Sequence, residues 1–284
     1  MDQPNFLFII CDQLRADHLG CYGNSVVRTP NIDGLAARGA RFDRSYVAYP
    51  VCMPNRACLM TGQMASDHRG INNGIPLDLE ATTFVEVLAH HGYQTGLIGK
   101  SHLQGYTPLD PMYGYIADDE LAAPPEELQD ALRLSRWSEG YRIERRIASG
   151  ELAQEPYRDG FYGFQHAELV TRHADFTDGH HLAWAKKQRP GFKNLVGAEN
   201  ALPDERERGP QAWRTAVPPE LYSTQFIAER SKAYIAEAAQ DDQPFFLQVS
   251  FTDPHHPFTP PGKYWDMYDP DDIPLPSSFG QITT

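Results

Sequence analysis

Residues 5–11 read NFLFIIC, an uninterrupted apolar run that Pro4 precedes and Asp12 ends. A run of this kind is typical of a strand that is buried on both faces of a parallel sheet. Residues 245–251 (FFLQVSF) follow Pro244 and are also strand-like, and residues 95–98 form a shorter apolar strand. The sequence therefore predicts buried strands, of which the first leads directly to a carboxylate.

Apolar residues at helical spacing separate these predicted strands. The pattern occurs at residues 32–36, 84–91 and 226–238, and Thr or Ser side chains that can cap a helix precede the second and third segments. Strands that alternate with helices usually pair in parallel through crossover connections. We therefore predict an α/β fold with a mostly parallel sheet flanked by helices.

The composition argues against several classes of protein. The chain has 284 residues, of which 41% are hydrophobic, enough for the core of a large domain. It carries 25 basic and 38 acidic residues, a balance opposite to that of nucleic-acid-binding proteins. The longest apolar run is far shorter than the roughly 20 residues of a membrane span, and no basic segment of a signal peptide precedes it. We expect a cytoplasmic protein that binds neither nucleic acid nor membranes, with its oligomeric state open.

One cysteine lies in a segment that carries chemistry. Residues 50–62 read PVCMPNRACLMTG, in which Cys52, Pro54 and Arg56 form a Cys-x-Pro-x-Arg motif. Cys52 precedes helix-forming residues, so we expect it at a helix N-terminus, where unpaired N–H groups favour negative charge. Arg56 follows one helical turn later, and its guanidinium can return toward residue 52. The remaining cysteines are predicted to be inert thiols: Cys11, Cys21 and Cys58.

This motif and its surroundings resemble the sulfatases of the alkaline phosphatase superfamily. In the sulfatase signature the cysteine is oxidised after translation to formylglycine. The matching segments follow the family's order: DQLRADHLGCYGN (12–24), TPNIDGLAARGARFDRSYV (29–47), GYQTGLIGKSHL (92–103) and PFFLQVSFTDPHHPF (244–258). The pair Asp12–Gln13 resembles the choline-sulfatase and phosphonate monoester hydrolase branches. Residues 104–220 carry little of the resemblance, which implies a variable insertion that selects the substrate.

The resemblance also implies that the chain is the N-terminal portion of a catalytic domain. Seven of the 32 residues from Asp253 onward are prolines, and no closing element is predicted after them. The family's second metal pair, Asp followed by Asn or His, and a further Lys have no match. We therefore expect residues 1–284 to be truncated at the C-terminus, with the C-terminal part absent, and to be poorly active alone.

The resemblance implies catalytic residues at positions that follow the predicted strands. Cys52, as an aldehyde hydrate, would attack sulfur or phosphorus and later expel the transferred group. Arg56 would stabilise the hydrate, Lys100 would bind an oxyanion oxygen, and His102 would relay a proton. His255 would protonate or hydrogen-bond the leaving group.

Asp12 is the principal predicted metal ligand, because ligands bind at the carboxyl ends of parallel strands. Its carboxylate suits a hard divalent ion, with Ca²⁺ as the first choice and Mg²⁺ or Mn²⁺ as alternatives. Residue 52 would be a second ligand, and the carbonyl oxygen of Gln13 a weaker third. Four further residues are expected to contact the substrate: Asn73, Tyr106, Thr107 and His256.

The leading hypothesis is hydrolysis of a small-molecule sulfate ester after a formylglycine-generating enzyme has modified Cys52. A phosphonate monoester or phosphodiester hydrolase with the same nucleophile is the close alternative, because tetrahedral anions share most contacts. An inactive fragment or a non-catalytic binding relative is the alternative of another class.

Overall fold

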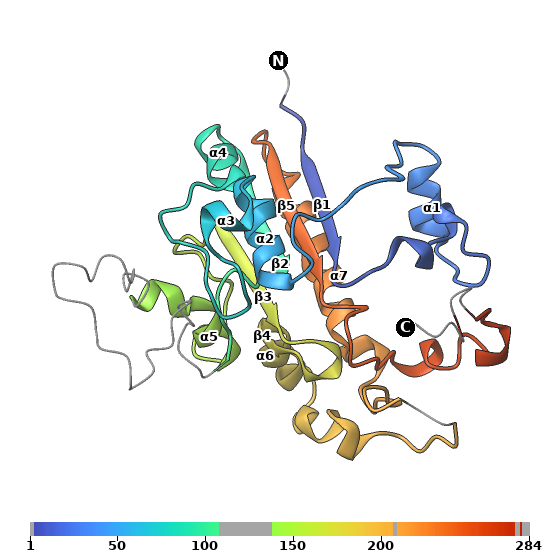
Figure 1. Ribbon diagram of the computed structural model, residues 1–284. Coiled ribbons are helices and arrows are strands. Elements are labelled where there is room, and N and C mark those ends of the chain that lie inside the picture. Colours follow the sequence, from blue (N-terminus) through green and yellow to red (C-terminus); the bar gives the residue numbers. More distant parts are fainter. Residues whose placement is uncertain (1–2, 108–137, 207–208, 276–278, 280–284) are drawn as a thin grey trace, which may run out of the picture.

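The computed structural model describes residues 3–107, 138–206, 209–275 and 279. Its described strands form one five-stranded sheet in the order β1-β5-β2-β3-β4 (Figure 1). They are β1 (Phe6–Cys11), β2 (Gln94–Gly99), β3 (His166–Thr171), β4 (Asp178–Gly179) and β5 (Phe245–Phe251). The short β4 pairs antiparallel with β3, and the other pairs are parallel. The predicted α/β fold with a mostly parallel sheet is confirmed.

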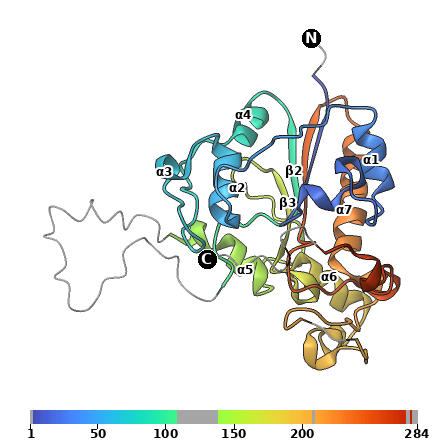
Figure 2. The ribbon, with the colours of Figure 1, turned by 45° about the vertical axis from the view of Figure 1, so that its right-hand side comes forward.

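Helices cover both faces of the sheet. They are α1 (Pro30–Ala36), α2 (Cys52–Thr61), α3 (Ala65–His68), α4 (Phe84–His90), α5 (Ile143–Ala148), α6 (His180–Gln188) and α7 (Ser223–Ala238). Figure 2 shows the sheet between α2 and α4 on one side and α7 on the other. Because α2 begins at Cys52, the predicted position of this cysteine at a helix N-terminus is confirmed.

Neighbouring residues of β2 contribute to two separate hydrophobic cores. Leu97 packs in a core with Met60 of α2 and Val85 of α4, whereas Ile98 packs with Ile227 of α7. Successive residues of a strand face opposite sides of the sheet. The central strands are therefore apolar on both faces because helices cover both.

β1 differs from this pattern because it lies at the edge of the described sheet. Phe6, Leu7 and Ile9 are 43%, 51% and 53% exposed. The prediction that this strand is buried on both faces was wrong. An uninterrupted apolar run reports the chemistry of its side chains, whereas burial depends on which segments, distant in sequence, pack beside the strand.

The strand register aligns the carboxyl ends of β1, β5 and β2. Cys11 pairs with Phe251, and Gly99 pairs with Ser250. The residues that follow β1 and β2 therefore emerge from the same edge of the sheet, with β5 between them. Gly99 has a φ of +109°, and a Cβ at this position would lie 1.9 Å from the carbonyl oxygen of Ser250. Glycine is required for this close approach.

Part of the sheet comes from the range 104–220, where sequence analysis recognised no strand. This range contains β3, β4 and α6, while residues 108–137 lie outside the described part of the chain. All six residues of β3 are buried although three are polar, and the carboxylate of Glu168 is satisfied by hydrogen bonds with His166 and Arg230. The interpretation of the range as a substrate-selecting insertion stays a prediction.

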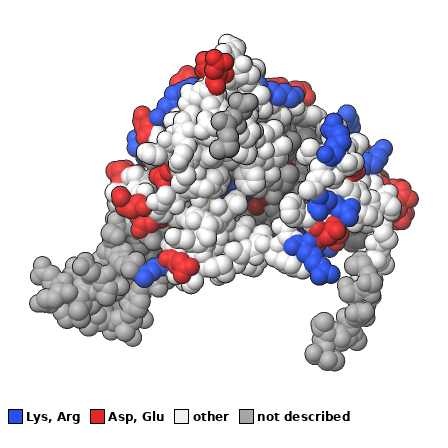
Figure 3. All heavy atoms as spheres, turned by 90° about the horizontal axis from the view of Figure 1, so that it is seen from above, with Lys and Arg blue, Asp and Glu red and all other residues white. Residues whose placement is uncertain are grey.

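Charged side chains of both signs lie around the face shown in Figure 3, with basic groups beside acidic ones. Within the described part of the chain, no helix has both the length and the apolar character that crossing a membrane requires.

Candidate active site at the carboxyl ends of the strands

Side chains from the ends of the four parallel strands converge at one edge of the sheet. Asp12 directly follows β1, Lys100 follows β2, His173 comes shortly after β3, and His255 comes shortly after β5. Cys52, the first residue of α2, lies beside them. This is the edge at which open parallel sheets bind their ligands.

A buried ion pair forms the centre of the site. Lys100 Nζ donates a hydrogen bond to Asp12 Oδ2, and these side chains are 1% and 9% exposed. Arg56 Nη2 lies 3.8 Å from Asp12 Oδ1. Burial alone would raise the pKa of Asp12, but the neighbouring His173 ring and the charges of Lys100 and Arg56 hold that pKa far below its usual range. Asp12 is therefore an anion at neutral pH.

Cys52 lies beside both members of this pair. Its Sγ is 3.7 Å from Asp12 Oδ1 and 3.8 Å from Lys100 Nζ. One ligand atom from each of Asp12, Cys52 and His255 lies within 4.8 Å of the others. The sulfur marks the place of an aldehyde-hydrate oxygen, should this cysteine be oxidised. The carboxylate and such an oxygen fit a hard divalent cation, whereas the imidazole is a ligand of softer ions such as Zn²⁺.

Arg56 connects α2 to the ends of two strands. Its Nη1 donates hydrogen bonds to the carbonyl oxygen of Lys100 at 2.8 Å and to Ser250 Oγ at 3.0 Å. The guanidinium is buried, so these hydrogen bonds replace water at Nη1. Arg56 thus fixes the helix that carries Cys52 against the edge that carries Lys100.

A buried carboxylate holds the loop that carries His102. Glu144 of α5 accepts hydrogen bonds from the backbone N–H groups of His102, Leu103 and Gln104 at 3.1, 2.8 and 3.0 Å. The Nδ1 atom of His102 is buried and has no partner among the described residues, so it is open to a water or a ligand. Burial and the charge of Lys100 hold the pKa of His102 well below its usual range. The imidazole is therefore neutral at pH 7 and able to accept a proton.

Three histidine rings form a stack in the site. The ring of His255 lies 3.6 Å from that of His173, with an interplanar angle of 9°, and 4.3 Å from that of His256. His255 Nδ1 donates a hydrogen bond to the carbonyl oxygen of His256 at 2.6 Å. In the neutral ring Nε2 is thus the nitrogen that can accept a proton or bind a metal.

Known proteins share both this sequence pattern and this arrangement. The family model named Sulfatase matches residues 4–131 and 151–277. The chain belongs to the sulfatase family. The matched ranges include Asp12, Cys52, Lys100, His173 and His255.

Individual relatives resemble the chain along nearly its whole sequence. The uncharacterized sulfatase YidJ of Escherichia coli is 28% identical over 268 residues, which cover 94% of this chain and 42% of that protein. An arylsulfatase of Clostridium perfringens is 27% identical over 287 residues, which cover 96% of this chain and 48% of that protein. The crystal structure of a phosphonate monoester hydrolase of Agrobacterium radiobacter matches with a TM-score of 0.65 and 27% identity over 96% of this chain and 45% of that chain. The sulfatase chain thus spans about half the length of the relatives it matches.

Two predicted substrate contacts lie next to residues that are predicted to be catalytic. Asn73 Oδ1 accepts a hydrogen bond from the backbone N–H of Met53 at 3.1 Å, so it supports the first turn of α2. The ring of Tyr106 lies 4.8 Å from that of His102. Burial, with the neighbouring charge of Glu144, raises the pKa of Tyr106 to about 12. Tyr106 is therefore a neutral hydroxyl in the physiological range.

Two other predicted residues lie at the margin of the site. Gln13 is exposed and has a φ of 62°, and it lines an apolar cavity of about 730 Å³ beside Cys11 and Leu14. Thr107 is exposed as well. Metal binding by Gln13 and substrate binding by Thr107 stay predictions.

Sequence analysis missed two residues that the structure places in the sulfatase site, Glu144 and His173. Glu144 lies in a charged stretch in which no local pattern separates a buried carboxylate from exposed ones. His173 follows β3, whose polar residues concealed the strand. A prediction of β3 would have identified His173 as a residue at the carboxyl edge of the sheet.

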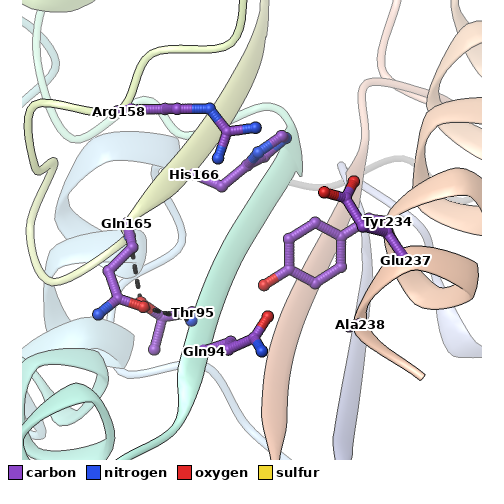
Figure 4. Close-up of a pocket in the computed structure, with 8 residues that line it drawn as sticks. All are labelled: Gln94, Thr95, Arg158, Gln165, His166, Tyr234, Glu237 and Ala238. Carbon is purple, nitrogen blue, oxygen red and sulfur yellow. Dashed lines mark hydrogen bonds between the residues drawn. The ribbon is translucent and has the colours of Figure 1, made fainter. Parts of the chain in front are cut away.

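The opposite end of the sheet has a small polar cavity of about 140 Å³ (Figure 4). It lies at the amino ends of β2 and β3, where the backbone N–H of Thr95 donates to Gln165 Oε1 at 3.1 Å. Tyr234 of α7 turns its ring toward this cavity. The residues that line it include none of the charged cluster around Cys52.

Proposed function

We propose that this protein hydrolyses sulfate esters of small molecules with a formylglycine nucleophile made from Cys52. The position of Cys52 Sγ, 3.7 Å from Asp12 Oδ1 and 3.8 Å from Lys100 Nζ, carries the proposal. A thiol without a chemical role does not require a buried ion pair beside it. A nucleophile that attacks an anionic ester needs a nearby cation to hold the ester.

Two groups would supply chemistry that unmodified side chains lack. An aldehyde hydrate at residue 52 supplies one hydroxyl for attack on sulfur and a second whose loss of a proton expels the sulfate. A divalent cation, Ca²⁺ as first choice, supplies ionisation of the attacking hydroxyl. Asp12 and residue 52 would hold this cation, with Gln13 as a further proposed ligand. A formylglycine-generating enzyme is the partner that this chemistry requires.

The side chains around residue 52 would bind the ester and transfer protons during the reaction. Lys100 binds a non-bridging oxygen of the ester, and Arg56 holds residue 52 in place through α2. His102, neutral and with an unpartnered Nδ1, takes the proton that is released when the sulfated residue collapses. His255, when protonated, gives its proton to the leaving oxygen. Tyr106, Asn73, Thr107 and His256 are proposed contacts to the substrate.

A phosphonate monoester or phosphodiester hydrolase is the second candidate. Solved phosphonate monoester hydrolases of Agrobacterium radiobacter and Silicibacter pomeroyi match this chain at 27% and 26% identity, with TM-scores of 0.65 and 0.61. Both ester classes present a tetrahedral anion to the same cations. Rates for a nitrophenyl sulfate and for a nitrophenyl phosphonate ester on the same protein preparation would separate the two candidates.

The decisive experiment measures the mass of the tryptic peptide that contains Cys52. We expect the mass loss of thiol-to-aldehyde conversion in protein produced with a formylglycine-generating enzyme, together with labelling by a hydrazide probe. Cys52→Ala should abolish both labelling and ester hydrolysis, whereas Cys21→Ala should leave them unchanged. An alkylatable thiol at Cys52 in fully active protein would contradict the mechanism. Modified protein that hydrolyses neither ester would favour an inactive fragment or a non-catalytic relative.

A further inference from the structure

His173 contacts the central ion pair of the site from the end of β3. Lys100 Nζ donates a hydrogen bond to His173 Nε2 at 2.5 Å, and the same nitrogen lies 3.4 Å from Asp12 Oδ2. The His173 side chain is 16% exposed, so it lies within the site rather than on its rim. Neither the Cys-x-Pro-x-Arg motif nor the other segments that resemble sulfatases include this histidine.

The backbone around His173 is held in an unusual conformation. Arg172 and Ala174 are both left-handed, with φ of 62° and 57°, whereas His173 between them is extended at φ −146°. Two flanking non-glycine residues in this region cost free energy, and such strain persists where the surroundings impose it. Here Arg172 Nε pairs with Asp178 at 2.8 Å, and Ala174 is fully buried. The strained turn directs the His173 ring toward Lys100.

The hydrogen bond to His173 restricts the direction of the Lys100 ammonium. A lysine ammonium has three N–H donors. Asp12 Oδ2 and His173 Nε2 accept two of them, and Cys52 Sγ lies 3.8 Å away in a third direction. The remaining donor is thus available on the side where the ester would meet residue 52.

The same imidazole also defines the plane of the His255 ring. The two rings are nearly parallel, at 9° and 3.6 Å, and His256 stacks on the other face of His255. The His255 ring therefore has little freedom to rotate away from the site. His173 thus contacts both the Lys100 ammonium and the His255 ring, two groups that the proposed mechanism uses.

We propose that His173 is a positioning residue that aims the Lys100 ammonium at the oxyanion and fixes the plane of the His255 ring. This inference rests on the proposed function for its catalytic consequence. The contact with Lys100 does not depend on that function: His173 Nε2 accepts the hydrogen bond from Lys100, so the neutral ring carries its proton on Nδ1.

Three substitutions distinguish the role of His173 as a hydrogen-bond acceptor from its role in the stack of histidine rings. His173→Phe keeps a ring against His255 but removes the acceptor. His173→Gln places an amide oxygen at the position of Nε2 and removes the ring, whereas His173→Asn reaches only the position of Nδ1. His91→Phe, at the exposed end of α4, is the matched histidine-to-phenylalanine control. Circular dichroism establishes that each variant is folded.

Binding of inorganic sulfate, measured by calorimetry, reports on Lys100 without requiring turnover. We expect His173→Phe and His173→Asn to bind sulfate roughly tenfold or more weakly, because a hydrogen bond to a charged group is lost. His173→Gln should recover most of that affinity, and His91→Phe should match the wild type. In active protein, His173→Phe should raise KM for the ester, while His173→Gln should lower kcat with little change in KM.

Nuclear magnetic resonance of ¹⁵N-labelled histidine identifies the tautomer of His173 even if neither sulfate binding nor turnover is detected. We expect His173 as the neutral Nδ1–H tautomer. An Nε2–H tautomer, or equal sulfate affinity in the wild type and His173→Phe, would overturn the inference. Equal losses in His173→Gln and His173→Phe would likewise refute the acceptor contact. Absence of ester hydrolysis with the expected tautomer would leave this inference standing, and it would contradict the proposed function if a longer protein with the predicted C-terminal part were also inactive.

Discussion

Lys100 at the end of β2 donates a hydrogen bond to Asp12 at the end of β1, although 88 residues and the intervening strand β5 separate them. The pair is buried, and Arg56 provides a second cation at 3.8 Å from the carboxylate. Burial of unequal charge is costly, so the three residues depend on one another.

Asp12→Asn should therefore destabilise the fold strongly. It leaves the buried cations of Lys100 and Arg56 without their counter-charge, a change that typically costs about 3–5 kcal/mol. Urea denaturation at pH 7 measures the loss, with the exposed Asp17→Asn as control. A loss of unfolding free energy below about 1 kcal/mol would show that Asp12 does not neutralise the buried charges of Lys100 and Arg56 as described.

His181 of α6 should make the fold sensitive to mild acid. Burial lowers its pKa to about 4, while Thr177 Oγ1 and the carbonyl oxygen of Leu221 bond its two nitrogens at 2.7 and 2.9 Å. The unfolded chain takes up this proton near pH 6.5, before the folded protein does. The contribution of neutral, buried His181 to the free energy of unfolding is thus fully present above that pH. It falls by about 3 kcal/mol as the pH decreases toward 4.

The measurement is the free energy of unfolding in urea at several pH values from 7.5 to 4.5. His181→Gln, whose amide N–H can replace Nε2 as the donor to Leu221 and which takes up no proton in this pH range, should have a flatter pH dependence than the wild type. Equal slopes for the two proteins would contradict this assignment.

Glu144→Ala should destabilise the loop at residues 102–104. The substitution removes one carboxylate that three backbone N–H groups share. Each buried donor left without an acceptor costs about 1–3 kcal/mol, so a total loss of about 3 kcal/mol or more is expected. Chemical denaturation provides the test, and Glu139→Ala, an exposed carboxylate nearby, should change stability little.

Asp175→Ala should release the segment between α6 and α7. Asp175 Oδ2 accepts hydrogen bonds from the Gly197 backbone, Trp213 Nε1 and Thr215 Oγ1 at 3.2, 3.0 and 2.7 Å. Without this acceptor the segment should open more often, and limited proteolysis should cut residues 190–217 several-fold faster than in the wild type. Unchanged cleavage would show that other contacts hold the segment.

The sequence alone determined the parts of this protein that depend on short-range pattern. Short segments that are wholly or mostly apolar predicted β1 and β5, because such a segment can be recognised as a strand from consecutive residues alone. Thr83 and Glu86 lie three residues apart at the start of α4 and cap it reciprocally, a signal contained in one helical turn. The motif around Cys52 likewise fits in one turn of α2.

Tertiary structure alone decided which of these elements are neighbours. The exposure of β1, the place of β3 in the sheet and the contacts of His173 and Glu144 depend on residues far apart in the chain. Glu168 can be buried in β3 only because Arg230 of α7 pairs with it at 2.7 Å. A local pattern carries no information about such partners, since the free energy that buries a polar group comes from contacts formed when the whole sheet assembles.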